Sequence, residues 1–163
     1  MRHINKEYFQ SAVFGVNDAL VSTTGVIVGV SAGTGDKHLI ILAGVVTILV
    51  EALSMGSGQY LSSKSAHQYS HDHHIKISLM SGVIMFFSYI VGGLVPLLLI
   101  LLAPVEYSIA AATSGALVGL FVLGYVKGKL VKTSPLRSAL EIVIIGGAAA
   151  AIGVLVGSLF NVR

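Results

Sequence analysis

The sequence has no cysteine and no tryptophan, and few of its residues carry a charge. Ten Lys and Arg and seven Asp and Glu make up 10% of its 163 residues, whereas about 25% of an ordinary soluble domain is charged. The absence of cysteine excludes disulfides, thiolate metal ligands and cysteine nucleophiles. So few charges cannot cover a water-soluble globule of this size. Disorder is excluded as well, because it requires low hydrophobicity and high charge.

Apolar residues dominate what is present. They make up 55% of the chain, and the mean hydropathy is +0.89. Five apolar stretches of about 20 residues, the length that crosses a bilayer, are separated by charged or turn-forming clusters. We therefore predict an all-α polytopic membrane protein that forms one domain over residues 1–163. The predicted spans are 9–33, 39–61, 79–103, 107–126 and 136–160, with a short His-rich cytoplasmic loop at 62–76.

The basic residues predict the orientation, because Lys and Arg collect on the cytoplasmic side of a membrane protein. Eight of the ten lie at the N-terminus and in the loops on the same side, and only Lys37 and Arg163 lie opposite. We therefore place the N-terminus in the cytoplasm. The same rule explains the net charge of +3 without a nucleic-acid partner. The polar residues 1–9 are not followed by the pattern of a signal peptide.

Glycine is abundant and patterned. Gly25, Gly29 and Gly33 are spaced four residues apart on the first predicted span. Lipid gives no hydrophobic drive for helix association, so close packing across small residues has to supply it. The spacing predicts a tight helix crossing, within one subunit or between two.

Acidic residues inside the spans are informative because each costs at least about 2.5–3.5 kcal/mol at mid-bilayer. Glu51 is the deepest, with uncharged sequence on both sides. On helical spacing it shares a face with Thr47, Ser54 and Met55, a polar stripe that contains a thioether. We interpret it as a cation or proton site that faces a cavity. The alternative is a protonated carboxylic acid that donates a hydrogen bond to a neighbouring helix.

Two further acids are weaker candidates. Asp18, beside Asn17, is either the N-cap of a helix that starts at Ala19 or a carboxylate inside a longer helix, where it can meet its copy in a second subunit. Glu141 follows Arg137 by four residues at the start of the fifth span. We interpret it as a structural residue, since Glu suits the N-terminal turn of a helix.

The segment after the second span is rich in histidine. His67, His71 and His74 would line one face if the helix continued beyond the membrane, and Asp72 and His73 lie between them. Imidazole and carboxylate together suit first-row divalent metals. This pattern predicts loose metal binding, and the alternative is a solvated turn.

Four segments, in order along the chain, carry a family resemblance. They are FGVNDALVST at 14–23, EALSMGSGQYLSSKS at 51–65, YIVGGLVPLL at 89–98, and GKL, PLRSALE and IIGG within 128–147. Together they resemble the vacuolar iron transporter family, including its short, nodulin-like members, over nearly the whole chain.

The resemblance implies a homodimer of five-helix subunits in a lipid bilayer, with the first helices lining a path at the subunit interface. Divalent iron or manganese would leave the cytosol along this path in exchange for protons. The family's first-helix aspartate falls on Asp18 and its second-helix methionine on Met55, which favours the transport interpretation of Asp18. The family's second-helix glutamate falls on Thr47, so we expect Glu51 to take over its role. The cytosolic metal-binding domain of typical members is replaced here by the loop at 62–76, so storage-like capture of several metals is not expected.

The resulting hypothesis is a proton-coupled exporter of Fe²⁺ or Mn²⁺, with Co²⁺ and Zn²⁺ as further candidates, and not an enzyme. Asp18, Glu51 and Met55 from two subunits would form the site, without a tightly bound cofactor. The thioether favours iron over magnesium or calcium. The membrane would be the cell membrane in a prokaryote or a vacuole-type membrane in a eukaryote. The alternatives are a non-transporting metal sensor or structural membrane module, and a carrier of an organic cation, for which the stripe beside Glu51 lacks aromatic walls.

Overall fold

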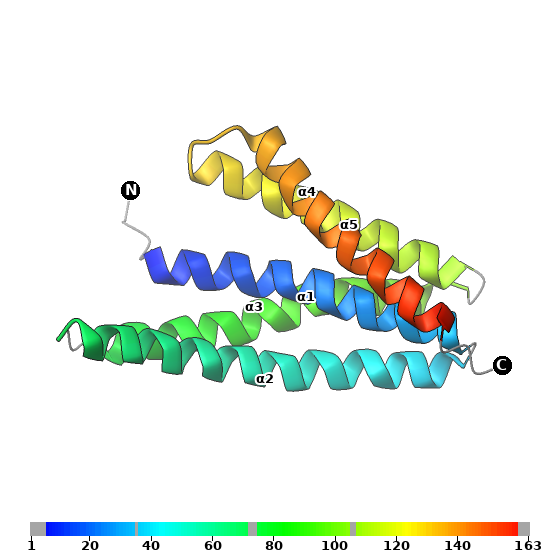
Figure 1. Cartoon of the computed structure of the whole chain (residues 1–163), viewed down its shortest axis with the longest axis horizontal. Coiled ribbons are helices and arrows are strands. Elements are labelled where there is room, and N and C mark those ends of the chain that lie inside the picture. Colours follow the sequence, from blue (N-terminus) through cyan, green and yellow to red (C-terminus); the bar gives the residue numbers. More distant parts are fainter. Residues whose placement is uncertain (1–5, 35, 72–74, 105–106, 160–163) are drawn as a thin grey trace.

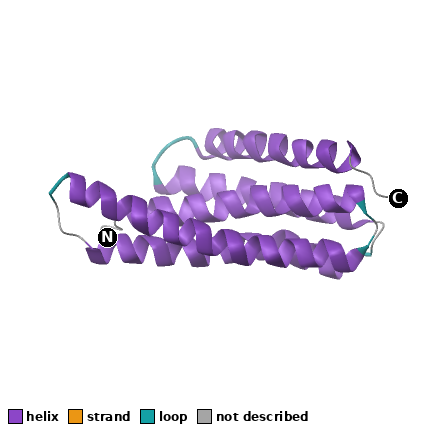
Figure 2. Ribbon diagram, turned by 60° about the horizontal axis from the view of Figure 1, so that its bottom comes forward, coloured by secondary structure: helices purple, strands orange, loops and turns teal. Residues whose placement is uncertain are grey.

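The computed structural model describes residues 6–34, 36–71, 75–104 and 107–159. Within these residues every regular element is a helix (Figures 1 and 2). All five helices are long and apolar enough to cross a membrane, which confirms the predicted all-α, five-span class. The helices are α1 (Lys6–Gly33), α2 (Lys37–Tyr69), α3 (Ile75–Leu102), α4 (Ser108–Leu130) and α5 (Pro135–Leu159).

The second helix is longer than the sequence analysis predicted. It does not end at residue 61 but continues to Tyr69, and α3 begins at Ile75, so helix occupies most of the expected loop 62–76. No glycine or proline follows Gly58 within α2 to interrupt the helix. Ser63, inside the extension, is buried between α1 and α3 and bonds to both. Hydropathy marks where the apolar stretch stops, but the helix ends only where its packing ends.

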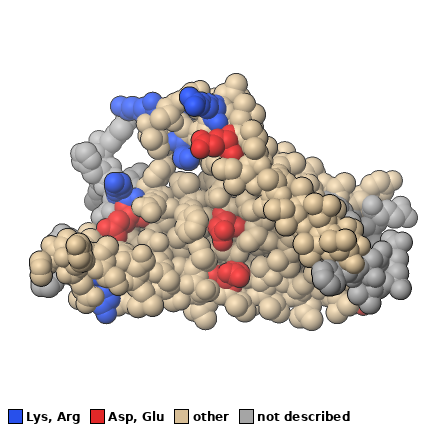
Figure 3. Space-filling view, viewed as in Figure 1, with Lys and Arg blue, Asp and Glu red and all other residues tan. Residues whose placement is uncertain are grey.

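The first helix lies at the centre of the bundle. It contacts all four other helices, and it lies between the α2–α3 pair and the α4–α5 pair (Figure 1). Basic side chains gather at one end of the bundle (Figure 3), where α1, α3 and α5 begin and α2 and α4 end. We call this the basic end. Among the described residues its members are Lys6, Lys64, Lys76, Lys127, Lys129, Lys132 and Arg137.

The glycine stripe of α1 packs within the chain, against α5. Gly25 and Gly29 face Gly153 and Gly157. A Cβ atom added at Gly153 would lie 2.5 Å from the carbonyl oxygen of Gly25, and one added at Gly29 would lie 3.0 Å from the carbonyl oxygen of Gly153. On α5, Gly153 and Gly157 therefore leave no room for a Cβ atom, whereas a Cβ at Gly25 would meet its nearest neighbour, the Ala149 carbonyl oxygen, only at 3.9 Å. The spacing predicted a crossing, and the structure shows α5 to be the partner at Gly25 and Gly29.

Gly153→Ala is expected to destabilise the protein by about 1–3 kcal/mol, because the added methyl group overpacks this crossing. Thermal unfolding in detergent measures the effect. Gly147→Ala is the matched control on the same helix, since its Cβ would meet only a Leu117 methyl group at 3.8 Å. Equal melting temperatures for Gly153→Ala and the wild type would contradict the crossing.

Candidate metal site

Two acids from neighbouring helices lie midway along the molecule. Asp18 on α1 is half-buried, and Glu51 on α2 is exposed. Their carboxyl groups are close enough for their charges to interact. Figure 3 shows two acidic patches in the middle of one face, over α1 and α2. The N-cap alternative for Asp18 is wrong, because α1 begins at Lys6 and Asp18 lies well inside it.

Small residues bring the two acids to the same level. Ala19 and Ala52, which directly follow the acids, form a fully buried cluster with Tyr89 of α3. This cluster is one of the points where α1, α2 and α3 meet. Met55, one turn beyond Glu51, packs against it and is only half-buried. The arrangement places two carboxylates and one thioether at the rim of a single three-helix contact.

Tyr89 of α3 is linked to the backbone of Asp18 through Ser22. The Ser22 hydroxyl donates to the backbone carbonyl of Asp18 at 2.7 Å, so its oxygen accepts from the Tyr89 hydroxyl at 2.6 Å. Sequence reasoning missed this residue, because an uncharged tyrosine in an apolar span gives no signal of its own. The only available signal was its place at the start of the resemblance segment 89–98.

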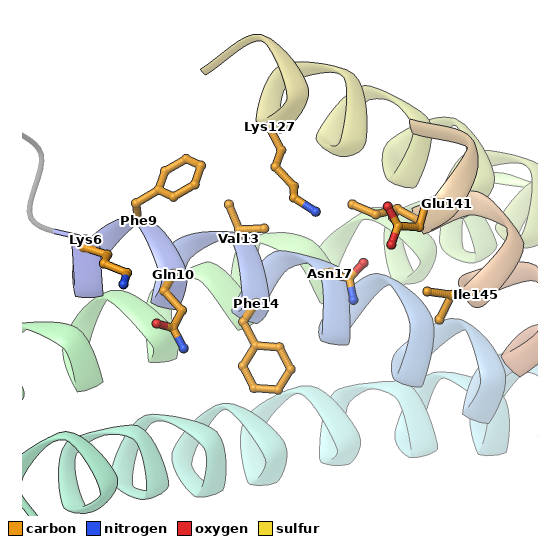
Figure 4. Close-up of a pocket in the computed structure, with 10 residues that line it drawn as sticks. Lys6, Phe9, Gln10, Val13, Phe14, Asn17, Lys127, Glu141 and Ile145 are labelled. Carbon is orange, nitrogen blue, oxygen red and sulfur yellow. The ribbon is translucent and has the colours of Figure 1, made fainter. Parts of the chain in front are cut away.

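The described secondary candidates lie in two different places. Thr47 is half-buried one turn before Glu51. Asn17 instead lines a groove of about 500 Å³ between α1 and the α4–α5 pair, together with Lys127 and Glu141. In Figure 4 the side chains of all three point into this groove. The structure therefore separates Asn17 and Glu141 from the Asp18–Glu51 pair.

His67 and His71 do not lie on one helix face. His67 lies in the last turn of α2, and its Nε2 is 2.9 Å from Glu7 Oε1 of α1. His71 lies past the helix end, exposed, with φ of 57°, because α2 stops at Tyr69. Three further predicted ligands, Asp72, His73 and His74, lie outside the described residues. Within the part of the chain that is described, no three His, Asp or Glu side chains come together as a metal site.

One face of α1 stays open despite the central position of the helix. A largely apolar groove of about 1090 Å³ runs along α1 toward the end opposite the basic end, with α5 on one side and Leu39 of α2 on the other. Phe14 and Val26 of α1 are 47% and 37% exposed. Asp18 lies between these two positions along α1. A single chain therefore leaves the surroundings of the acids uncovered.

Comparison with known proteins gives one consistent result. The family model described as "VIT family" matches residues 9–78 and 70–158. The chain is 24% identical to vacuolar iron transporter 1 of Arabidopsis thaliana, over 89% of this chain and 83% of that protein. It is 28% identical to vacuolar iron transporter homolog 4 of the same plant, over 86% and 77%. The first alignment spans 207 positions, more than the 163 residues of this chain, so that relative carries segments that this chain lacks.

Proposed function

Because the chain belongs to the VIT family, we propose that this integral membrane protein moves divalent iron or manganese out of the cytosol in exchange for protons. The basic end faces the cytosol in this proposal, since Lys and Arg accumulate on that side, and the N-terminus lies there too. The matched relatives are named as vacuolar transporters. A vacuole-type membrane is therefore the proposed location in a eukaryotic cell, and the cell membrane in a prokaryote.

The observation that carries the proposal is the Asp18–Glu51 pair at the rim of the three-helix contact. Two interacting carboxylates at membrane depth are costly in lipid and characteristically mark ion pathways. A divalent cation compensates both charges, and two protons do the same. Because metal ligands must be deprotonated, either occupant displaces the other. This competition is a physical basis for exchange. The Met55 thioether, a soft ligand, favours a transition metal over Mg²⁺ or Ca²⁺.

The pair is an incomplete site within one chain. Transition metals take about four to six ligands, and Asp18, Glu51 and Met55 supply three side chains. Glu51 is exposed on a surface that would otherwise face lipid. A second copy packed against the open face of α1 would cover the acids and double the number of donors. We propose a twofold homodimer in which the two α1 helices line the path.

The test of the function is metal flux into proteoliposomes that contain the purified protein. We expect an imposed pH gradient to drive uptake of Fe²⁺ or Mn²⁺ and to leave Mg²⁺ outside. Liposomes without protein give the background flux. The alternative of a metal sensor or structural module predicts no flux above background, and also predicts that Glu51→Gln keeps or raises the thermal stability.

The dimer is tested by cross-linking, for which the absence of cysteine provides a clean background. Phe14→Cys and Val26→Cys on the open face of α1 are expected to give disulfide-linked dimers in membranes under mild oxidation. Val118→Cys on α4 is the matched control, since it is 63% exposed but lies away from α1's open face. Cross-linking through residue 118 and none through α1 would contradict the proposed interface.

A further inference from the structure

The groove between α1 and the α4–α5 pair lies toward the basic end, apart from the Asp18–Glu51 pair. Its volume of about 500 Å³ is within the range of about 300–1,000 Å³ that is typical of ligand sites. A second hollow of about 410 Å³, between α4 and α5, adjoins it, since Lys127 and Glu141 line both. We call the joined space the basic groove.

Basic side chains outnumber acidic ones along the basic groove. Its charged lining residues are Lys6, Lys127 and Arg137 against Glu141, so three positive charges and one negative charge leave a net charge of +2. Within the described residues none of the three basic side chains forms an ion pair. Lys129, the next lysine of α4, lies over a tyrosine ring instead. The groove therefore presents positive charge that no described carboxylate compensates.

Lys127 is the best placed of these charges. It lies in the last turn of α4 and is half-buried, and its side chain points into the groove (Figure 4). A lysine in this position extends its methylene chain along apolar surface and keeps its ammonium group at the polar level of the membrane. Glu141 faces the same space but does not come within ion-pair distance of Lys127. The ammonium group is therefore available to an anion in the groove.

The wall of the groove becomes apolar away from the basic end. Val13 on α1 and Ile142 and Ile145 on α5 line this part. Val13 is seven residues past Lys6, and Ile145 is ten residues past Pro135, the first residues of their helices. At about 1.5 Å per residue, the apolar wall lies about 10–15 Å deeper than the helix ends. The groove thus suits an amphiphile with an anionic head and an apolar tail.

An anionic phospholipid matches both parts of the groove. Anionic lipids are enriched in the cytosolic leaflet, and basic pockets between transmembrane helices on that side bind their headgroups. A soluble anion would use the basic residues but not the apolar wall. A second copy of the chain, related by a twofold axis along the membrane normal, would bring its own basic end to the same level, where like charges repel.

We propose that the basic groove binds one anionic phospholipid from the leaflet at the basic end. Its phosphate contacts Lys127, with Lys6 and Arg137 adding positive charge, and one acyl chain lies along Val13 and Ile145. The bound lipid fills the space between α1 and the α4–α5 pair. The assignment to the cytosolic leaflet rests on the proposed orientation, but the binding does not depend on transport.

Tryptophan fluorescence tests the proposal, because the chain has no tryptophan of its own. Ile145→Trp places the probe in the groove wall. Ile144→Trp is the matched control, since residue 144 is 70% exposed and does not line the groove. The full-length variants are reconstituted in mixtures of phosphatidylcholine and phosphatidylglycerol, and one lipid at a time carries brominated acyl chains, which quench nearby tryptophan. We expect phosphatidylglycerol to be preferred about fivefold or more at residue 145, the factor that one basic residue near an anionic headgroup supplies, and no preference at residue 144.

Changes of charge in the Ile145→Trp protein identify the headgroup contact. Lys127→Gln is expected to abolish the preference, and Lys127→Arg, which keeps the charge, to retain it. Glu141→Gln is expected to raise the preference, because it removes a negative charge from the groove. Lys129→Gln, on the same helix but outside the groove, should leave it unchanged.

Three results would overturn the proposal. Equal quenching by the two lipids at residue 145, or equal losses in Lys127→Gln and Lys129→Gln, would show that the groove does not select an anionic lipid. Absence of quenching by either lipid at residue 145 would place protein, such as a second copy, over the groove. Loss of the preference on addition of free glycerol phosphate would assign the groove to a soluble anion.

Discussion

Asp18→Asn is expected to lower metal flux about a hundredfold or more, since even the outer partners of metal ligands are worth 10–100-fold in affinity. The amide has nearly the shape of the carboxylate, but it neither balances a divalent charge nor releases a proton. The fold should be retained, because Ser22 bonds to the backbone carbonyl of Asp18 rather than to its side chain. Tracer uptake into proteoliposomes measures the flux, and the melting temperature checks the fold.

Glu141→Gln is the control for this variant. Glu141 is an acid at the α1–α5 groove beside Asn17, apart from the Asp18–Glu51 pair, so its neutralisation should change flux less than twofold. Wild-type flux in a correctly folded Asp18→Asn protein would remove Asp18 from the pathway.

Glu51→Gln is the second change with a large expected effect, and it is expected to abolish flux for the same electrostatic reason. A further variant tests the shift relative to the family pattern. Thr47→Glu, introduced together with Glu51→Gln, returns a carboxylate one turn earlier on the same helix, about 6 Å away. We expect the double variant to recover part of the flux, measured in the same assay.

Glu51→Asp is the control that keeps a carboxylate at the original position, and it should retain more flux than Glu51→Gln. Full activity in Glu51→Gln would show that this acid serves only helix packing. No recovery in the double variant, with a normal melting temperature, would show that the carboxylate must lie at position 51.

Composition and hydropathy were sufficient to predict the five membrane helices. Polar groups are costly in lipid, and this cost requires both an apolar sequence and a helical backbone in each span. Composition and hydropathy were not sufficient for helix ends. The extension of α2 to Tyr69 depends on contacts of Ser63 and His67 with other helices, and no local pattern records such contacts. Glycine spacing predicted a close helix crossing, because helices in lipid associate through small residues. It did not predict the partner helix, because Gly153 and Gly157 could be recognised as facing glycines only in the structure.

Some residues of the candidate site could also be predicted from the sequence, and others could not. Depth in an apolar stretch singled out Glu51, and the family resemblance strengthened Asp18, because charge in lipid is conspicuous in a sequence. Tyr89 and Glu7 were missed. Tyr89 is uncharged, and Glu7 lies in a polar N-terminal segment where an acid is ordinary. The partner of Glu7 is His67 on another helix, sixty residues later by their numbering, so only the packing of α1 against α2 brings them together.

The most direct test of the central claim is whether a proton gradient alone drives the metal. Proteoliposomes are prepared with equal Mn²⁺ concentrations on both sides, an acidic interior and a neutral exterior, and the internal Mn²⁺ and pH are followed together. The account predicts that Mn²⁺ accumulates inside while protons leave, and that both movements stop in Asp18→Asn. Mn²⁺ that stays evenly distributed while the wild-type protein is active in downhill flux would contradict exchange at the Asp18–Glu51 pair.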